Sequence, residues 1–202
     1  EEIADYTELN LHMKMDEPPM QRLRSWVDPY SYRARYTLPK LILLGTNAPY
    51  WTVDSLRHYC DDLPDPKLIF QTPNAGHDLA GGRDAMLTLA GWLQMLLDRQ
   101  ELPKVGWRFA TGDAGVQATA TSSLPARQAR AWLADSPDRD FRNDTWTARD
   151  LALSADGREA RIEVPQPASG YRAYLIEFTL ATPAGHEIRL STEARVTPDT
   201  KP

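Results

Sequence analysis

The chain has 202 residues and a formal net charge of −5, which does not favour a nucleic-acid partner. No apolar run approaches the roughly 20 residues of a membrane-spanning helix, so we expect no transmembrane segment. A hydrophobic content of 42% is typical of a globular protein with a real core, and the single cysteine, Cys60, excludes an internal disulfide.

Residues 1–102 alternate helical and strand patterns. In chain order, apolar spacing predicts helices over 3–15 and 20–27, a strand over 40–44, a helix over 53–63, a strand over 67–70 and a helix over 85–97. Asp54 lies in the first turn of the third helix, where its charge suits the helix dipole. Asp84 is placed to cap the last helix. This order is typical of an α/β fold, a mostly parallel sheet covered by helices.

Two strands cannot form such a sheet alone, because their faces and edges need neighbours. We therefore expect residues 1–102 to be the C-terminal part of a larger α/β domain. The missing strands would come from an upstream segment of the same protein or from a companion chain.

Residues 103–202 have a different pattern, with short strands separated by turns. The expected strands are 105–109, 116–121, 126–134, 160–164, 171–182 and 187–196. Their spacing predicts an all-β sandwich-like domain of the immunoglobulin or fibronectin kind, joined to the first domain near Pro103. Trp107, Trp132 and Trp146 are expected in its core, with exposed sugar-binding aromatics as the alternative.

Two polar turns follow the two predicted strands of the first half. Gly45-Thr46-Asn47-Ala48 comes after the first, and Asn74-Ala75-Gly76-His77-Asp78 after the second. In the α/β-hydrolase arrangement the triad acid and then the triad histidine occupy such turns, after an earlier serine. His77 is the candidate base. Ala48 stands at the acid position and cannot orient it, and the nucleophile would precede residue 1.

Other residues near these turns are secondary candidates. Asn47, Tyr50, Trp51 and Asp78 are candidates for a substrate pocket, in which the aromatic pair stacks on a ligand ring or packs as pocket wall. Asp54 is a candidate substitute acid, although helix capping also explains it. Asp78 is poorly placed to orient its own neighbour in the sequence.

The remaining chemistry-bearing residues carry no further site. One set of residues has the side-chain types of a metal site: Asp61, Asp62, Asp65, His77 and Asp78. Their spacing matches no zinc or EF-hand pattern. Cys60 lies on the apolar side of the predicted helix as a structural thiol. We expect no metal and no cofactor.

Three motifs match a known family when taken together. DPYSYR (28–33), GTNAPYW (45–51) and NAGHDL (74–79) resemble the PhoPQ-activated pathogenicity-related family, an α/β-hydrolase group. Residues 126–151 and 171–198 resemble its β-rich C-terminal region. The resemblance implies a longer bacterial protein, periplasmic or secreted, with an upstream serine. It places His77 at the family's histidine and Ala48 where the family has an aspartate.

Three functions stay open at this point. The chain is the C-terminal portion of a serine-hydrolase-like protein for ester or amide bonds, inactive as written. Alternatively, it is a non-catalytic binding protein whose sandwich recognises a partner or glycan. In the third reading it pairs with a separate chain that carries the first half of the hydrolase. The ligand is an unknown small molecule or peptide.

Overall fold

The computed structural model describes residues 4–200, which form a mostly β protein with 36% strand and 25% helix. Its strands make three small sheets of two, five and three strands, and none of them closes into a barrel. Within these residues no helix is long and apolar enough to cross a membrane.

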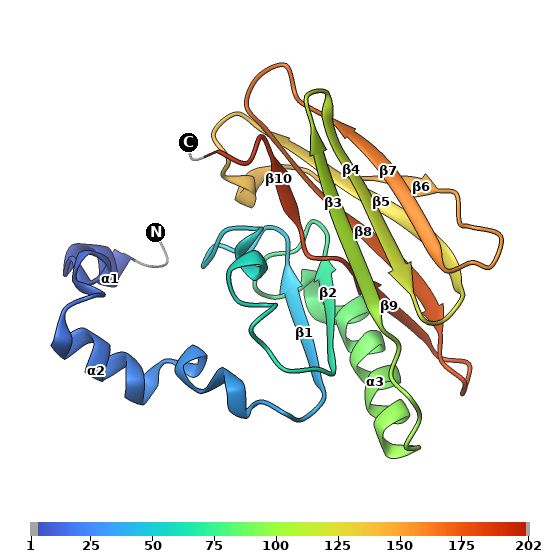
Figure 1. Ribbon diagram of the computed structural model, residues 1–202, viewed down its shortest axis with the longest axis horizontal. Helices are drawn as coiled ribbons and strands as arrows, with labels where there is room; N and C mark the ends of the chain where they lie inside the picture. The colour runs from blue at the N-terminus through green and yellow to red at the C-terminus, as the bar shows by residue number, and fades with distance from the viewer. Residues whose placement is uncertain (1–3, 201–202) are drawn as a thin grey trace.

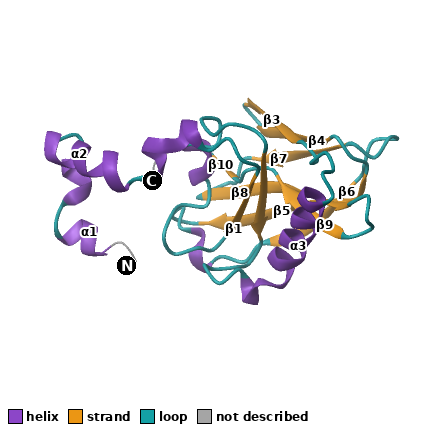
Figure 2. Cartoon of the chain, turned by 90° about the horizontal axis from the view of Figure 1, so that it is seen from below, coloured by secondary structure: helices purple, strands orange, loops and turns teal. Residues whose placement is uncertain are grey.

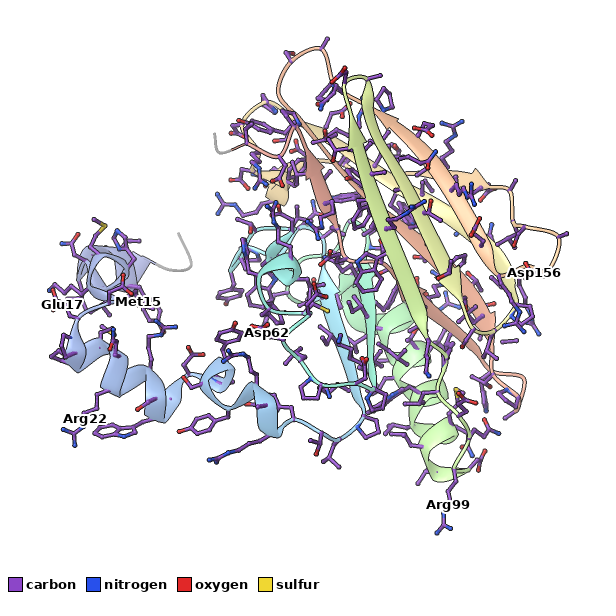
Figure 3. All side chains as sticks on the ribbon, viewed as in Figure 1. Met15, Glu17, Arg22, Asp62, Arg99 and Asp156 are labelled. Atoms are coloured by element: carbon purple, nitrogen blue, oxygen red, sulfur yellow. The ribbon has the colours of Figure 1, made fainter. Side chains whose placement is uncertain are left out.

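An N-terminal arm projects from the rest of the molecule (Figures 1 and 2). It consists of α1 (Ala4–Glu8), η1 (Leu11–Lys14), α2 (Pro18–Val27) and η2 (Pro29–Arg35). Its apolar side chains are exposed, among them Tyr6, Leu9, Met13, Trp26 and Val27. The arm is tied to the body where the Tyr30 hydroxyl and the Arg33 guanidinium both meet Asp62, which is labelled in Figure 3.

The two strands of the first half pair in parallel. Strand β1 (Lys40–Gly45) lies beside β2 (Lys67–Thr72), with Gly45 opposite Thr72 at their carboxyl ends. No other strand of residues 4–200 pairs with β1. Helix α3 (Arg83–Leu97), preceded by η4 (Ala80–Gly82), packs mainly against β9 of the second half.

The second half contributes two antiparallel sheets. The three-stranded sheet has the order β3 (Val105–Gly112), β4 (Gly115–Ser122), β7 (Glu159–Pro165). The five-stranded sheet has the path β10 (Arg195–Thr197), β8 (Tyr171–Ala181), β5 (Ala126–Ser136), β6 (Thr147–Leu151), with β9 (Glu187–Ser191) also on β8. The short helix η5 (Phe141–Asn143) lies between β5 and β6.

One hydrophobic core joins the two halves. Buried side chains of β4 and β7 pack with those of β5, β8 and β9, and Leu68 of β2 and Met95 of α3 belong to the same cluster. Trp146 is buried in a second cluster with Phe141, as expected of a core tryptophan. Residues from both sides of position 102 therefore share one core.

The predicted fold class, an α/β-hydrolase sheet with covering helices, is wrong for this chain. The structure is mostly β, its parallel sheet has only two strands, and α3 packs mainly on a strand of the second half. The expected helix over 53–63 is only the 3₁₀ turn η3 (Ser55–His58). Leu56 of that turn and Cys60, two residues after it, are still buried in one core cluster, so their helical spacing was satisfied without a helix.

The other predicted helices and strands of the first half agree better with the structure. Helix α2, helix α3 and the strands 40–44 and 67–70 are confirmed within a few residues. The helix expected over 3–15 is divided between α1 and η1, and its first residue lies outside the described residues. Asp84 lies in the first turn of α3, but the N-cap is Gly82.

Candidate functional site

The candidate site lies in the two turns that follow β1 and β2. Parallel pairing brings the carboxyl ends of both strands to one edge, the edge at which α/β sheets commonly bind ligands. The turns approach closely: a Cβ on Gly45 would lie 2.2 Å from the carbonyl oxygens of Ala75 and Gly76. Glycine is therefore required at residue 45 for the second turn to pass over the first.

A polar network joins the two turns. The Thr46 hydroxyl donates to the Asn47 Oδ1 at 2.7 Å and accepts from the Asn74 N–H at 3.0 Å. The Asn47 N–H donates to the Ala75 carbonyl at 2.9 Å. These bonds fix the backbone just before Ala48, which is only 3% exposed.

The two motif asparagines face the second half of the chain. Asn47 Nδ2 lies 2.9, 3.2 and 2.8 Å from the carbonyl oxygens of Phe141, Arg142 and Asp144. Asn74 bonds both the N–H and the carbonyl of Trp146, at 2.7 and 2.9 Å. Asn47, expected in a substrate pocket, therefore holds backbone of the segment 141–146.

His77 belongs to an exposed aromatic cluster with Tyr50 and Trp51. Its ring centroid lies 4.8 Å from that of Tyr50 and 5.9 Å from that of Trp51, both edge-on. Within residues 4–200 no carboxylate hydrogen-bonds or ion-pairs with the His77 ring. The predicted aromatic pair thus lies beside the candidate base, whereas no carboxylate of the described residues bonds to that base.

The rest of this loop has a constrained backbone. Leu79 and Ala80 have φ values of 56° and 55°, a region that costs free energy for residues other than glycine. Asp78 Oδ1 accepts from the Ala80 N–H at 3.3 Å, so its carboxylate supports this turn locally. It does not orient His77.

Asp54, the candidate substitute acid, is held by arginines. It is 2% exposed, and its Oδ2 lies 2.8 Å from Arg139 Nη2 and 3.2 Å from Arg57 Nη1. Arg57 continues to Asp199 near the C-terminus, and this hydrogen-bonded arginine holds the pKa of the Asp199 carboxyl below its usual range. Asp54 thus joins three distant segments of the chain.

Metal and thiol chemistry have little support among residues 4–200. They contain no group of three or more His, Cys, Asp or Glu side chains placed to hold a metal ion. Cys60 is 1% exposed, and burial raises the pKa of its thiol to about 11, as expected of a structural cysteine.

The sequence profile of the PhoPQ-activated pathogenicity-related proteins matches residues 1–142 of the 202. The chain belongs to this family. The matched region takes in both polar turns and ends at Arg142, within the segment 141–146 that Asn47 and Asn74 contact.

A curated relative extends the likeness over the remaining residues. The chain is 24% identical over 229 aligned residues to "Autocrine proliferation repressor protein A" of Dictyostelium discoideum. The alignment covers 99% of this chain and 46% of that protein, so the chain spans about half the length of the relative.

Sequence reasoning about this family member missed Arg139 and the contacts of the segment 141–146. Arg139 lies 85 residues after Asp54, and Phe141 lies 94 residues after Asn47. Both lie within residues 126–151, whose resemblance to the family assigns them no contact, and no local pattern pairs them with Asp54 or Asn47. The one available signal was the pair of asparagines themselves, since buried turns need side-chain partners for their backbone groups.

Proposed function

We propose that this chain carries the histidine part of a degenerate hydrolase site, which binds a ligand at its aromatic cluster and does not hydrolyse it. The observation that carries the proposal is the buried Ala48. It occupies the turn joined to the histidine turn, and a methyl group cannot fix the imidazole tautomer or stabilise an imidazolium. The proposal is based on the residues of the site and not on the fold class, because one fold can carry many different chemistries.

The aromatic cluster supports the binding half of the proposal. Tyr50 and Trp51 are each 41% exposed, so large apolar ring surface remains available beside His77. Exposed aromatic rings with a polar edge are enriched where proteins bind other molecules. The ligand class we propose is a small molecule or peptide with a flat ring or apolar face.

Asp54 does not restore catalysis under this proposal. Both of its arginine contacts use Oδ2, and swinging the carboxylate toward His77 would take the buried partner from two partly buried guanidinium groups and leave them only the more exposed Asp199. Breaking a buried pair in this way is costly. The arginine contacts therefore favour a structural role for Asp54.

The open edge of β1 and the exposed apolar arm support a further partner. We propose a hydrolase-like segment, upstream in the same protein or in a companion chain, that covers both. An exported location, periplasmic or secreted, is consistent with the family and belongs to the same proposal. A purified chain that stays monomeric, with its arm resistant to proteolysis, would count against the partner.

Two assays test the site. The intact 202-residue chain is treated with a fluorophosphonate probe and weighed by mass spectrometry, and its hydrolysis of p-nitrophenyl acetate is compared with that of His77→Ala. We expect no adduct and no turnover above the variant. A stoichiometric adduct, or turnover that disappears in His77→Ala, would overturn the non-catalytic assignment.

A further inference from the structure

A large cavity lies away from the aromatic cluster, between the first half and strands β3, β8 and β10. Its volume is about 1100 Å³, just above the range of about 300–1,000 Å³ that is usual for small-molecule pockets. Neither Ala48, His77 nor the two rings beside His77 line it. It is therefore a second candidate site, independent of the proposed function.

Aromatic side chains form one wall of this cavity. Phe109 and Tyr174 meet edge to face, with ring centroids 5.7 Å apart, and the Arg195 guanidinium lies 5.2 Å from the Phe109 centroid. Trp107 also lines the cavity and fixes its indole by donating Nε1–H to Glu193 Oε1 at 3.2 Å. The wall is thus aromatic and is held in place by polar contacts.

The ion pair of Glu193 and Arg195 in the wall uses only one of the two carboxylate oxygens. Glu193 is 4% exposed, and its Oε1 accepts from Arg195 Nε at 2.8 Å and Nη2 at 2.5 Å as well as from Trp107. Within residues 4–200 no group hydrogen-bonds to Glu193 Oε2 or to Arg195 Nη1. The pair is neutral overall and retains one acceptor and one donor group for a ligand.

The Tyr174 hydroxyl adds a third unused group. Tyr174 is 3% exposed and lines the cavity, yet its hydroxyl bonds to no group of residues 4–200. The hydroxyl oxygen itself is not fully enclosed, so a ligand in the cavity can reach it. Burial raises the pKa of this phenol to about 12, so the hydroxyl stays neutral and can donate a hydrogen bond.

These features select a ligand by its chemistry. Five acidic and four basic side chains line the cavity, so charge of neither sign dominates it, whereas hydroxyl groups can both donate to Glu193 Oε2 and accept from Tyr174. The apolar face of a pyranose ring suits the aromatic wall. We propose that this cavity binds a short neutral oligosaccharide, with Glu193, Arg195 and Tyr174 bonding its hydroxyl groups.

Isothermal titration calorimetry of the full chain tests the proposal, with cellobiose, maltotriose and N,N′-diacetylchitobiose as neutral probes. Sialyllactose and spermidine serve as charged comparisons. We expect millimolar or tighter binding of at least one neutral saccharide and weaker binding of both charged probes. Absence of binding by all neutral saccharides, or binding of charged probes alone, would overturn it.

The variant Tyr174→Phe locates the site. It removes only the unpartnered hydroxyl, so folding is retained, and we expect saccharide affinity to fall about 3- to 10-fold, the effect of one hydrogen bond. Tyr6→Phe is the matched control, because Tyr6 is 61% exposed on the N-terminal arm and does not line the cavity, and it should bind as the parent chain does. Equal affinity in the parent and in Tyr174→Phe would contradict the assignment. Failure of the His77 proposal would leave these results unchanged.

Discussion

Replacing Asn47 with alanine should destabilise the protein by releasing the segment 141–146. The amide group of Asn47 serves three backbone carbonyls, all between 2.8 and 3.2 Å away. At about 1 kcal/mol per net hydrogen bond, with two N–H groups shared among three acceptors and carbonyls left unpaired, the loss is about 2–3 kcal/mol. For a chain of this length that loss lowers Tm by about 4–12 °C.

Urea unfolding followed by circular dichroism measures this effect, and hydrogen exchange over residues 141–146 reports where it acts. Asn143→Ala is the matched control, because Asn143 lies exposed in the same segment, and it should stay within about 0.5 kcal/mol of the parent. A double-mutant cycle with Asn74→Ala should show coupling, since both asparagines hold neighbouring backbone. Equal stability of Asn47→Ala and the control would refute the docking role.

Three further substitutions test the packing and the charges. Asp54→Asn should cost about 1–3 kcal/mol in urea unfolding, because two arginines lose a buried charged partner and keep only Asp199; a change within the experimental error would show the ion pairs to be dispensable. Gly91→Ala should lower Tm by an amount corresponding to about 1–3 kcal/mol, because its Cβ would lie 2.4 Å from Ile188 Cγ2 at the α3–β9 contact; an unchanged or higher Tm would mean that β9 yields. Burial raises the pKa of the Glu177 carboxyl above its ordinary 4.5, so its ionisation costs stability as pH rises from 4.5 through the raised value. Glu177→Gln should therefore unfold at higher urea than the parent at neutral pH and lose that advantage in acid; a pH-independent difference would contradict this.

The local elements of the fold were predictable because their signals are local. Apolar runs mark β1 and β2, and the apolar face of residues 85–97 marks α3. Strand β6 was missed because Thr147–Leu151 is almost wholly exposed and shows no alternation of apolar and polar residues. Its pairing with β5 comes from the partner strand, which the sequence of β6 does not reveal.

The prediction of the fold class was wrong because it depended on contacts between residues far apart in the chain. The amphipathic pattern of α3 shows that one face is buried but does not identify the surface that covers it, and here that surface is mainly β9, about 100 residues later in the chain. The candidate site was predicted only in part, because some of its contacts also join residues far apart in the chain. The positions of His77, Tyr50 and Trp51 follow from two strand ends, whereas the role of Asn47 depends on residues 141–144.

The most direct test of the central claim, that Ala48 stands where an acid would orient His77, is the imidazole tautomer in the variant Ala48→Asp. Long-range ¹H–¹⁵N NMR of the folded variant should show His77 shifted to the Nδ1–H form with a hydrogen-bonded, downfield Nδ1 proton. Neither the parent chain nor Ala80→Asp, which adds the same charge in the histidine loop, should show that proton. A folded Ala48→Asp variant whose His77 signals match those of Ala80→Asp would contradict the account.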